Sequence, residues 1–141
     1  MSIWKCNDTI EDLKEKSKNT LVENIGIEYL EISENYIKAR MPVDERTRQP
    51  YGILHGGASL AFAETLGSVA ARLSIDNEQK RCVGIEINAN HLRSVHEGFV
   101  YGTVKPINIG RTLHVWEITI NDEENRLVCI SRMTLSILDK K

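Results

Sequence analysis

The sequence predicts a single α+β domain over residues 1–141, in which a curved antiparallel sheet wraps around one long central helix. Three observations lead to this prediction. One stretch of small and apolar residues has the composition of a buried helix, several shorter stretches have the composition of β-strands, and most of these strands follow one another directly. Consecutive strands favour antiparallel pairing, and a sheet that curves around the helix would cover its apolar surface.

The N-terminal region from Asp8 to Lys18 is polar apart from a narrow apolar stripe of Ile10 and Leu13. This pattern predicts a short amphipathic helix that packs through the stripe. Asp8 or Thr9 is expected to cap its N-terminus, because short side chains with an oxygen acceptor favour that position.

Two β-like runs, Ile25–Ile32 and Tyr36–Met41, are separated by three polar residues at 33–35, which predicts a hairpin. A long polar loop is expected at 42–54. The central helix should then run from about Gly57 to about Leu73.

The second half of the chain is typical of strands joined by polar loops and turns. In the first of these strands, alternation places Val83, Ile85 and Ile87 on one face. A solvated loop at 76–80 precedes this strand, and a polar turn at 121–125 precedes the last. The four predicted strands span residues 81–90, 98–107, 112–120 and 126–138.

Composition and charge exclude several classes of protein. Hydrophobic residues make up 41% of the chain, which excludes disorder, and a net charge of −2 gives no basic field for nucleic acid. We expect no signal peptide and no membrane association, because no apolar run has the required length. Cys6, Cys82 and Cys129 have no paired spacing, which favours reduced thiols in a cytoplasmic protein. The four histidines lack metal-ligand spacing, so no metal is expected.

The central helix carries one carboxylate, Glu64, among small and apolar residues and begins at the glycine pair Gly56–Gly57. If Glu64 is buried, its ionised form loses hydration, which marks it as a candidate catalytic group. Alternatively, it faces solvent or forms a structural salt bridge. The glycines allow close approach to the first N–H groups of the helix, which could stabilise a developing oxyanion. A plain tight turn at the helix start is the alternative.

The spacing of these groups constrains the site. Gly57 and Glu64 are seven residues apart, so they lie about 10 Å apart along one helix. A small reacting group cannot touch both in the same subunit. If both act on one carbonyl, the site must lie between two copies of the chain, as in a homodimer. Ser68 follows Glu64 by four residues and shares its helix face, where it could orient the carboxylate or hold a water.

Several motifs resemble those of a known family. The sequence is similar to the hotdog-fold acyl-CoA thioesterases of the phenylacetate-pathway and Arthrobacter-type 4-hydroxybenzoyl-CoA group, and within that group to the bacterial 1,4-dihydroxy-2-naphthoyl-CoA hydrolases of menaquinone biosynthesis. The enterobactin proofreading thioesterases have a similar pattern. The motifs that carry this resemblance are 41–44, 49–57, 63–68, 84–91 and 105–110.

The resemblance implies a hotdog fold, hydrolysis of an aromatic acyl-CoA thioester, and specific roles for matching residues. Glu64 would be the nucleophile or the general base, and Ser68 would support it. Gln49 and the backbone N–H near Gly56 would polarise the thioester carbonyl. His55 would assist at the helix mouth, that is, at the N-terminal end of the central helix. No cofactor is implied, because CoA is part of the substrate. A homotetramer is also implied, whereas the helix-length argument supports only the dimer.

The resemblance also assigns a substrate channel. Arg93 and Arg111 are the strongest candidates for CoA phosphates, because guanidinium groups suit phosphate oxygens. Leu60, Phe62 and Val69 are expected to form walls of the acyl pocket. The expected substrate-binding residues are Gly84, His91, Leu92, Arg93, Ser94, Asn108, Ile109, Gly110, Arg111, Thr112 and Leu113.

Other functions are less consistent with the sequence. An α/β-hydrolase would need a GxSxG elbow, which this chain lacks. A hotdog dehydratase would need a His–carboxylate arrangement that is not seen. A non-catalytic acyl-CoA-binding module would not need Gln49 and Glu64 together. A thioesterase that acts on acyl or aryl carrier proteins stays open as the alternative to a CoA-thioester hydrolase.

Overall fold

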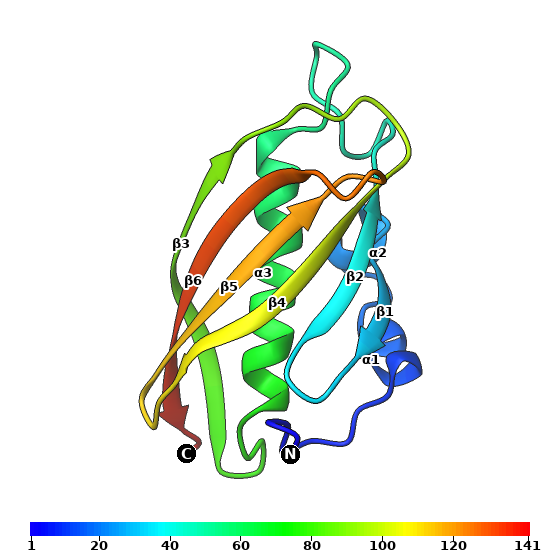
Figure 1. Cartoon of the computed structure of the whole chain (residues 1–141). Helices are drawn as coiled ribbons and strands as arrows, with labels where there is room; N and C mark the ends of the chain where they lie inside the picture. The colour runs from blue at the N-terminus through cyan, green and yellow to red at the C-terminus, as the bar shows by residue number, and fades with distance from the viewer.

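In the computed structural model, which describes residues 1–141, a six-stranded antiparallel sheet curves around one long helix, α3 (Gly56–Leu73) (Figure 1). The strand order is β1-β2-β4-β5-β6-β3, so β1 and β3 form the two edges of the sheet. This arrangement confirms the predicted α+β class and hotdog architecture. The strands are β1 (Glu28–Ile32), β2 (Ile37–Pro42), β3 (Lys80–His91), β4 (Phe99–Ile109), β5 (Leu113–Asn121) and β6 (Leu127–Asp139).

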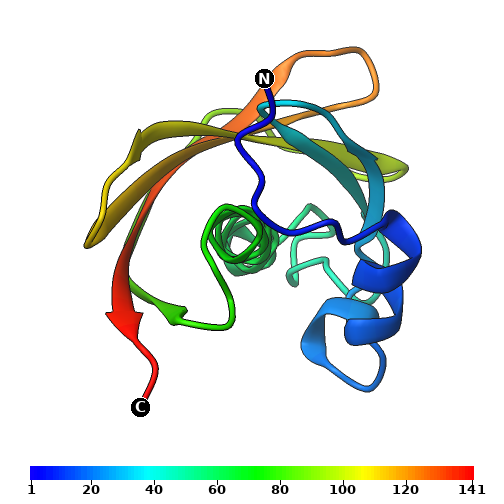
Figure 2. The same cartoon turned by 90° about the horizontal axis from the view of Figure 1, so that it is seen from below.

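Viewed along α3, the sheet arches over the helix and leaves its opposite side uncovered by strands (Figure 2). Two short helices, α1 (Ile10–Lys16) and α2 (Leu21–Asn24), lie beside α3 on the side of β1. The edge strand β3 lies on the other side. One face of α3 is therefore bounded by α1 and α2 on one flank and by β3 on the other.

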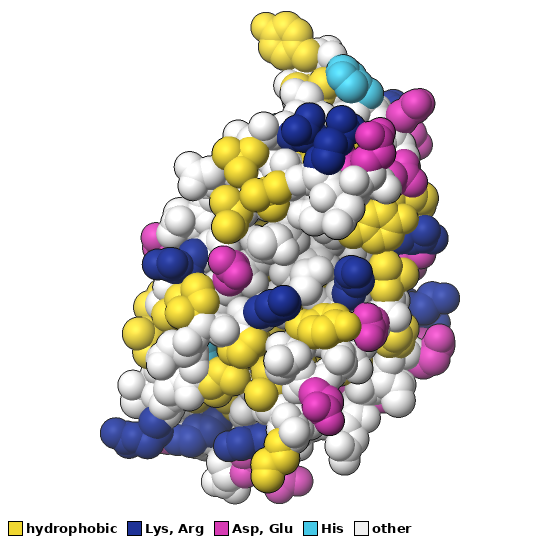
Figure 3. Space-filling view, viewed as in Figure 1, with side chains coloured by type: hydrophobic (Ala, Val, Ile, Leu, Met, Phe, Trp, Pro, Cys, Tyr) yellow, Lys and Arg dark blue, Asp and Glu magenta, His cyan; other side chains and the backbone are white.

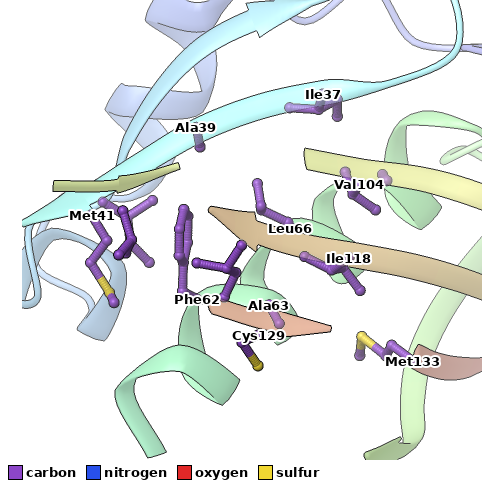
Figure 4. Close-up of a cluster of buried hydrophobic side chains, with 14 of the residues drawn as sticks. Ile37, Ala39, Met41, Phe62, Ala63, Leu66, Val104, Ile118, Cys129 and Met133 are labelled. Atoms are coloured by element: carbon purple, nitrogen blue, oxygen red, sulfur yellow. The ribbon is translucent and has the colours of Figure 1, made fainter. Parts of the chain in front are cut away.

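The buried positions of α3 recur every three or four residues, which is the period of one helix face. This face packs on the inner surface of the sheet, where Phe62, Ala63 and Leu66 meet Met41 and Ile118 (Figure 4). The uncovered face carries Glu64. The buried positions of the helix are Ser59, Phe62, Ala63, Leu66, Gly67, Ala70, Ala71 and Leu73.

Close packing of α3 on the sheet depends on Gly102 in β4. A Cβ atom on Gly102 would lie 2.8 Å from side-chain carbons of both Phe62 and Leu66. Phe62 is fully buried in this contact. The prediction that Phe62 forms a wall of the acyl pocket is therefore wrong, because its ring faces the sheet rather than the open side of the helix.

The N-terminal helix forms as predicted, and Thr9 is the cap. The Thr9 hydroxyl accepts a hydrogen bond from the Asp12 N–H at 3.2 Å, and the Asp12 carboxylate accepts one from the Thr9 N–H at 2.8 Å. The short helix α2 was not predicted. Because its C-cap is Ile25, strand β1 begins three residues later than expected, at Glu28.

The predicted alternation in β3 is wrong. Pairing with β6 shifts register between Gly84 and Glu86, so a β-bulge changes which side chains face the core. Ile87 packs against the core, whereas Val83 is 37% exposed and Ile85 is 58% exposed. An edge strand therefore presents apolar side chains to the outside. The other predicted strands end within two residues of the observed bounds.

His114, on β5, is buried, and its titration makes the free energy of unfolding depend on pH. Burial lowers the pKa of its imidazole, so the folded protein favours the neutral ring. The unfolded chain takes up this proton first as pH falls below about 6.5. We therefore expect the free energy of unfolding to fall progressively below that pH.

Chemical denaturation at a series of pH values measures this effect. His114→Gln should flatten the dependence between about pH 6.5 and pH 5, because the titrating group is removed. His96→Gln is the matched control, because His96 is exposed. An unchanged slope in the His114 variant would contradict the assignment.

Candidate active site

The start of α3 presents polar groups that can bind a carbonyl oxygen. His55 is the N-cap, and its Nδ1 accepts a hydrogen bond from the Gly57 N–H at 2.8 Å. With Nδ1 as acceptor, Nε2 carries the ring proton and can donate it. The Gly56 N–H, at the first position of the helix, has no partner in the structure. The helix mouth therefore offers one backbone donor and one imidazole donor.

His91, at the end of β3, lies against this helix start. A Cβ atom on Gly56 would lie 3.1 Å from His91 Nε2, so a larger residue would require the imidazole to shift by a few tenths of an ångström. The chain then turns away, and the N–H groups of Leu92 and Arg93 donate to the carbonyl of Val128. The structure thus places His91, one of the predicted substrate-binding residues, beside the start of α3.

Gln49 lies in a loop that projects beyond the end of α3 (Figure 1). Its backbone N–H donates to the Ile53 carbonyl at 2.8 Å, and its side-chain oxygen accepts from the Tyr51 N–H. Because the amide oxygen is held inside the loop, the amide NH₂ group is the part left to donate. Tyr51 is 90% exposed at the tip of the same loop.

Glu64 lies on the open face of α3, and its side chain is exposed in the single chain. Of the alternatives that the sequence left open for Glu64, the single chain has the solvent-facing one, because the sheet covers only the opposite face of the helix. No salt bridge holds Glu64, which excludes the structural ion pair considered above. The carboxylate is free to act on a ligand or to meet another copy.

Two hollows flank Glu64. The larger, of about 540 Å³, lies between α3 and the α1–α2 segment and is also lined by Ser68 and Val69. The smaller, of about 250 Å³, lies toward β3 and is lined by Gly84. Glu64 Oε2 is 3.7 Å from where a Gly84 Cβ would lie. Gly84 and Val69 therefore line the hollows beside Glu64, and their contact with a substrate stays a prediction.

Ser68 shares the larger hollow with Glu64 but makes no hydrogen bond to its carboxylate. Leu60 lines neither hollow. In this structure, Ser68 is positioned to contact a bound water or ligand rather than to orient Glu64 directly.

The turn at 108–113 lies at the opposite end of the sheet from the helix mouth (Figure 1). It is held locally, since the Gly110 N–H and the Asn108 side-chain amide both donate to the Leu113 carbonyl. Arg111 is exposed in this turn, and Lys and Arg side chains gather at the lower left of Figure 3. Within one chain, the two predicted CoA-binding segments are therefore not brought together.

A feature that the sequence analysis missed lies at the far end of the larger hollow. Arg72 from α3 and Lys16 from α1 both line it, and both bind the carboxylate of Asp8, at 3.0 and 2.6 Å. The spacing of Glu64, Ser68 and Arg72, four residues each, places all three on one helix face and could have signalled this.

No group of three or more His, Cys, Asp and Glu side chains is arranged as a metal site. None of the three helices has both the length and the hydrophobicity of a membrane-spanning segment.

Several known proteins with similar sequences and structures are named as thioesterases or thioester hydrolases, and others as putative esterases. A model of the thioesterase superfamily matches residues 51–129. The chain is 48% identical over 136 residues to the 1,4-dihydroxy-2-naphthoyl-CoA hydrolase of Escherichia coli, covering 96% of this chain and 99% of that one. It is 48% identical over 137 residues to the proofreading thioesterase EntH of Cronobacter turicensis, covering 96% and 98%. The crystal structure of thioesterase HI1161 from Haemophilus influenzae matches with a TM-score of 0.94 and 50% identity over 97% of this chain and 95% of that chain.

Proposed function

The chain belongs to the thioesterase superfamily and is a thioester hydrolase, and we propose that its substrate is the CoA thioester of an aromatic acid. One observation carries the proposal. An unpaired helix N–H at Gly56, preceded by the His55 imidazole, belongs to the same helix as the free carboxylate of Glu64, and the Gln49 amide lies in the loop that leads into this helix. These are the groups that thioester hydrolysis requires, namely donors for an oxyanion and a base or nucleophile.

In the proposed mechanism, the thioester carbonyl oxygen accepts hydrogen bonds from the Gly56 N–H and the Gln49 amide of one copy. Glu64 of a second copy faces the carbonyl carbon. As a general base it takes a proton from water, the hydroxide attacks, and the C–S bond breaks to release CoA thiol and a carboxylic acid. As a nucleophile it forms an anhydride with loss of the thiolate, and water then hydrolyses the anhydride. Both routes use the same residues.

Two copies are needed because Gly56 and Glu64 are eight residues apart on α3, about 12 Å along the axis. The edge strand β3 is suited to join them. It is twelve residues long, has no neighbour on its outer side, and exposes Val83 and Ile85. Such an edge favours pairing with another strand. We propose that β3 pairs with its copy about a two-fold axis, which covers Glu64 and the Gly84 region.

A two-fold axis through β3 also accounts for the separated CoA segments. Antiparallel pairing places the lower end of one copy beside the upper end of the other. The 108–113 turn of one subunit would then approach the 91–94 segment of its partner. We propose that Arg93 and Arg111 from the two subunits bind the CoA phosphates.

The similar proteins support an aromatic acyl group. One is named for hydrolysis of 1,4-dihydroxy-2-naphthoyl-CoA, and we propose this thioester of menaquinone biosynthesis as the substrate. Another is named a proofreading thioesterase, so a carrier-protein thioester is the alternative. We also propose that two dimers form a cytoplasmic homotetramer, following the family resemblance.

The test is free-thiol release from a panel of thioesters by the purified protein. The panel contains 1,4-dihydroxy-2-naphthoyl-CoA, benzoyl-CoA, phenylacetyl-CoA and a medium-chain acyl-CoA, with a benzoyl-loaded carrier protein beside them. We expect the aroyl-CoA thioesters to have the highest kcat/KM. Preference for the carrier protein would support the alternative, and preference for the medium chain would contradict the aromatic class.

A further inference from the structure

The larger hollow beside Glu64 has a negatively charged side chain at one end and positively charged side chains at the other. Its walls are largely apolar, with Leu13, Leu21, Val22 and Val69 among them. Of the charged side chains that line it, Glu64 is negative, whereas Lys16 and Arg72 are positive. The hollow therefore joins the candidate reacting carboxylate to a cationic end, with Ser68 between them on the same face of α3.

The cationic end lies at a defined distance from Glu64. Arg72 follows Glu64 by eight residues on α3, which is about 12 Å along the axis. Helical side chains lean toward the N-terminus of their helix, so the Arg72 stem reaches back toward Ser68. The space left between the carboxylate and the guanidinium suits a group of the length of one or two aromatic rings.

The two cations are only partly neutralised. Asp8 Oδ2 binds Lys16 Nζ at 2.6 Å and Arg72 Nη2 at 3.0 Å, so one carboxylate serves two positive groups. Both contacts help to lower the pKa of the Asp8 carboxyl against the effect of burial, so Asp8 stays charged. Asp12 is bound to Thr9 in the cap of α1 and does not line the hollow. A net positive charge therefore remains at this end.

Donors at the same end suit an oxygen acceptor. A guanidinium has five N–H donors, and one carboxylate oxygen does not use them all. Burial raises the pKa of the Tyr29 hydroxyl, which also lines the hollow and stays a protonated donor. An apolar acyl group would leave the N–H and O–H donors of Arg72 and Tyr29 without hydrogen-bond partners. An oxygen atom on the ring of the substrate would accept hydrogen bonds from them.

We propose that Arg72, supported by Lys16, selects aroyl groups that carry an oxygen acceptor on the ring at a position other than the one next to the thioester carbon. The inference rests on the proposed function, because it takes Glu64 as the residue next to the reacting carbonyl. According to this inference, the α1–α2 segment forms part of the substrate pocket. The preference among acyl groups is then set by the charges of Arg72 and Lys16, which are not among the catalytic groups.

The test measures kcat/KM for 4-carboxybenzoyl-CoA and for benzoyl-CoA and compares their ratio between variants. We expect the ratio to fall about tenfold or more in Arg72→Met, because a charge-assisted hydrogen bond to the ring carboxylate is lost. Arg72→Lys should retain most of the ratio. Lys16→Met should lower it by about two- to fivefold, because Lys16 is 56% exposed and partly screened.

Lys14→Met is the matched control, because Lys14 lies on the same helix α1 but does not line this hollow. Its ratio should equal that of the wild type. The wild-type ratio should also fall as salt is added. If Arg72→Met lowers both substrates equally, or if no variant changes the ratio, the inference is wrong while the proposed function stands. If the wild type hydrolyses no aroyl-CoA, the proposed function fails and the inference fails with it.

Discussion

Glu64→Gln should lower kcat for aroyl-CoA hydrolysis by about 10²–10⁴-fold, the range that removal of a positioned base or nucleophile produces. The amide keeps the size and the hydrogen-bonding reach of the carboxylate but can neither accept a proton at neutral pH nor attack a carbonyl. Because Glu64 makes no salt bridge and is exposed in the single chain, its replacement should leave the fold unchanged. The measurement is thiol release under saturating substrate, with circular dichroism as a check on folding.

Glu78→Gln provides the control for Glu64→Gln, because Glu78 is also exposed and follows α3 in the loop before β3. Its activity should match that of the wild type. Activity of Glu64→Gln within about threefold of the wild type would leave the thioesterase activity in place and discard Glu64 as the reacting group.

Co-expressing two inactive variants, or unfolding and refolding them together, should restore activity if the site is shared between subunits. Gln49→Ala removes a donor to the carbonyl and should cost about 10²–10³ in kcat. In a heterodimer of Gln49→Ala and Glu64→Gln subunits, one site receives the intact residue from each chain and the other site receives neither. With random pairing, half of the dimers are heterodimers and half of their sites are intact, so about a quarter of wild-type activity should return.

The restored activity depends on subunit exchange, which supplies the control. Each variant alone, and the two mixed without unfolding or co-expression, should stay inactive. A co-expressed mixture that shows no more activity than the sum of its parts would place the donors and Glu64 in a single subunit. Light scattering of the wild type separately reports whether the dimer forms.

Much of the fold could be predicted because it follows from local patterns. The period of buried residues on α3, the polar turn before β6 and the cap at Thr9 all depend on residues close together in sequence. The exceptions have local causes that no periodicity shows. The bulge between Gly84 and Glu86 turned Val83 and Ile85 outward, and residues 25–27, predicted as the start of the first strand, form the C-cap of α2 and its connection to β1.

The sequence alone determined the fold class and the helix that carries Glu64. It also determined the separation of Gly57 and Glu64, because the rise of a helix fixes the distance between them. Only the tertiary structure decided which face of that helix the sheet covers, that His91 packs on Gly56, and that the 108–113 turn lies at the other end of the sheet. It also brought Lys16, Arg72 and Asp8 together from segments up to 64 residues apart. Such contacts depend on how the sheet curves and on which elements pack beside α3, and these are set by long-range packing rather than by any local pattern.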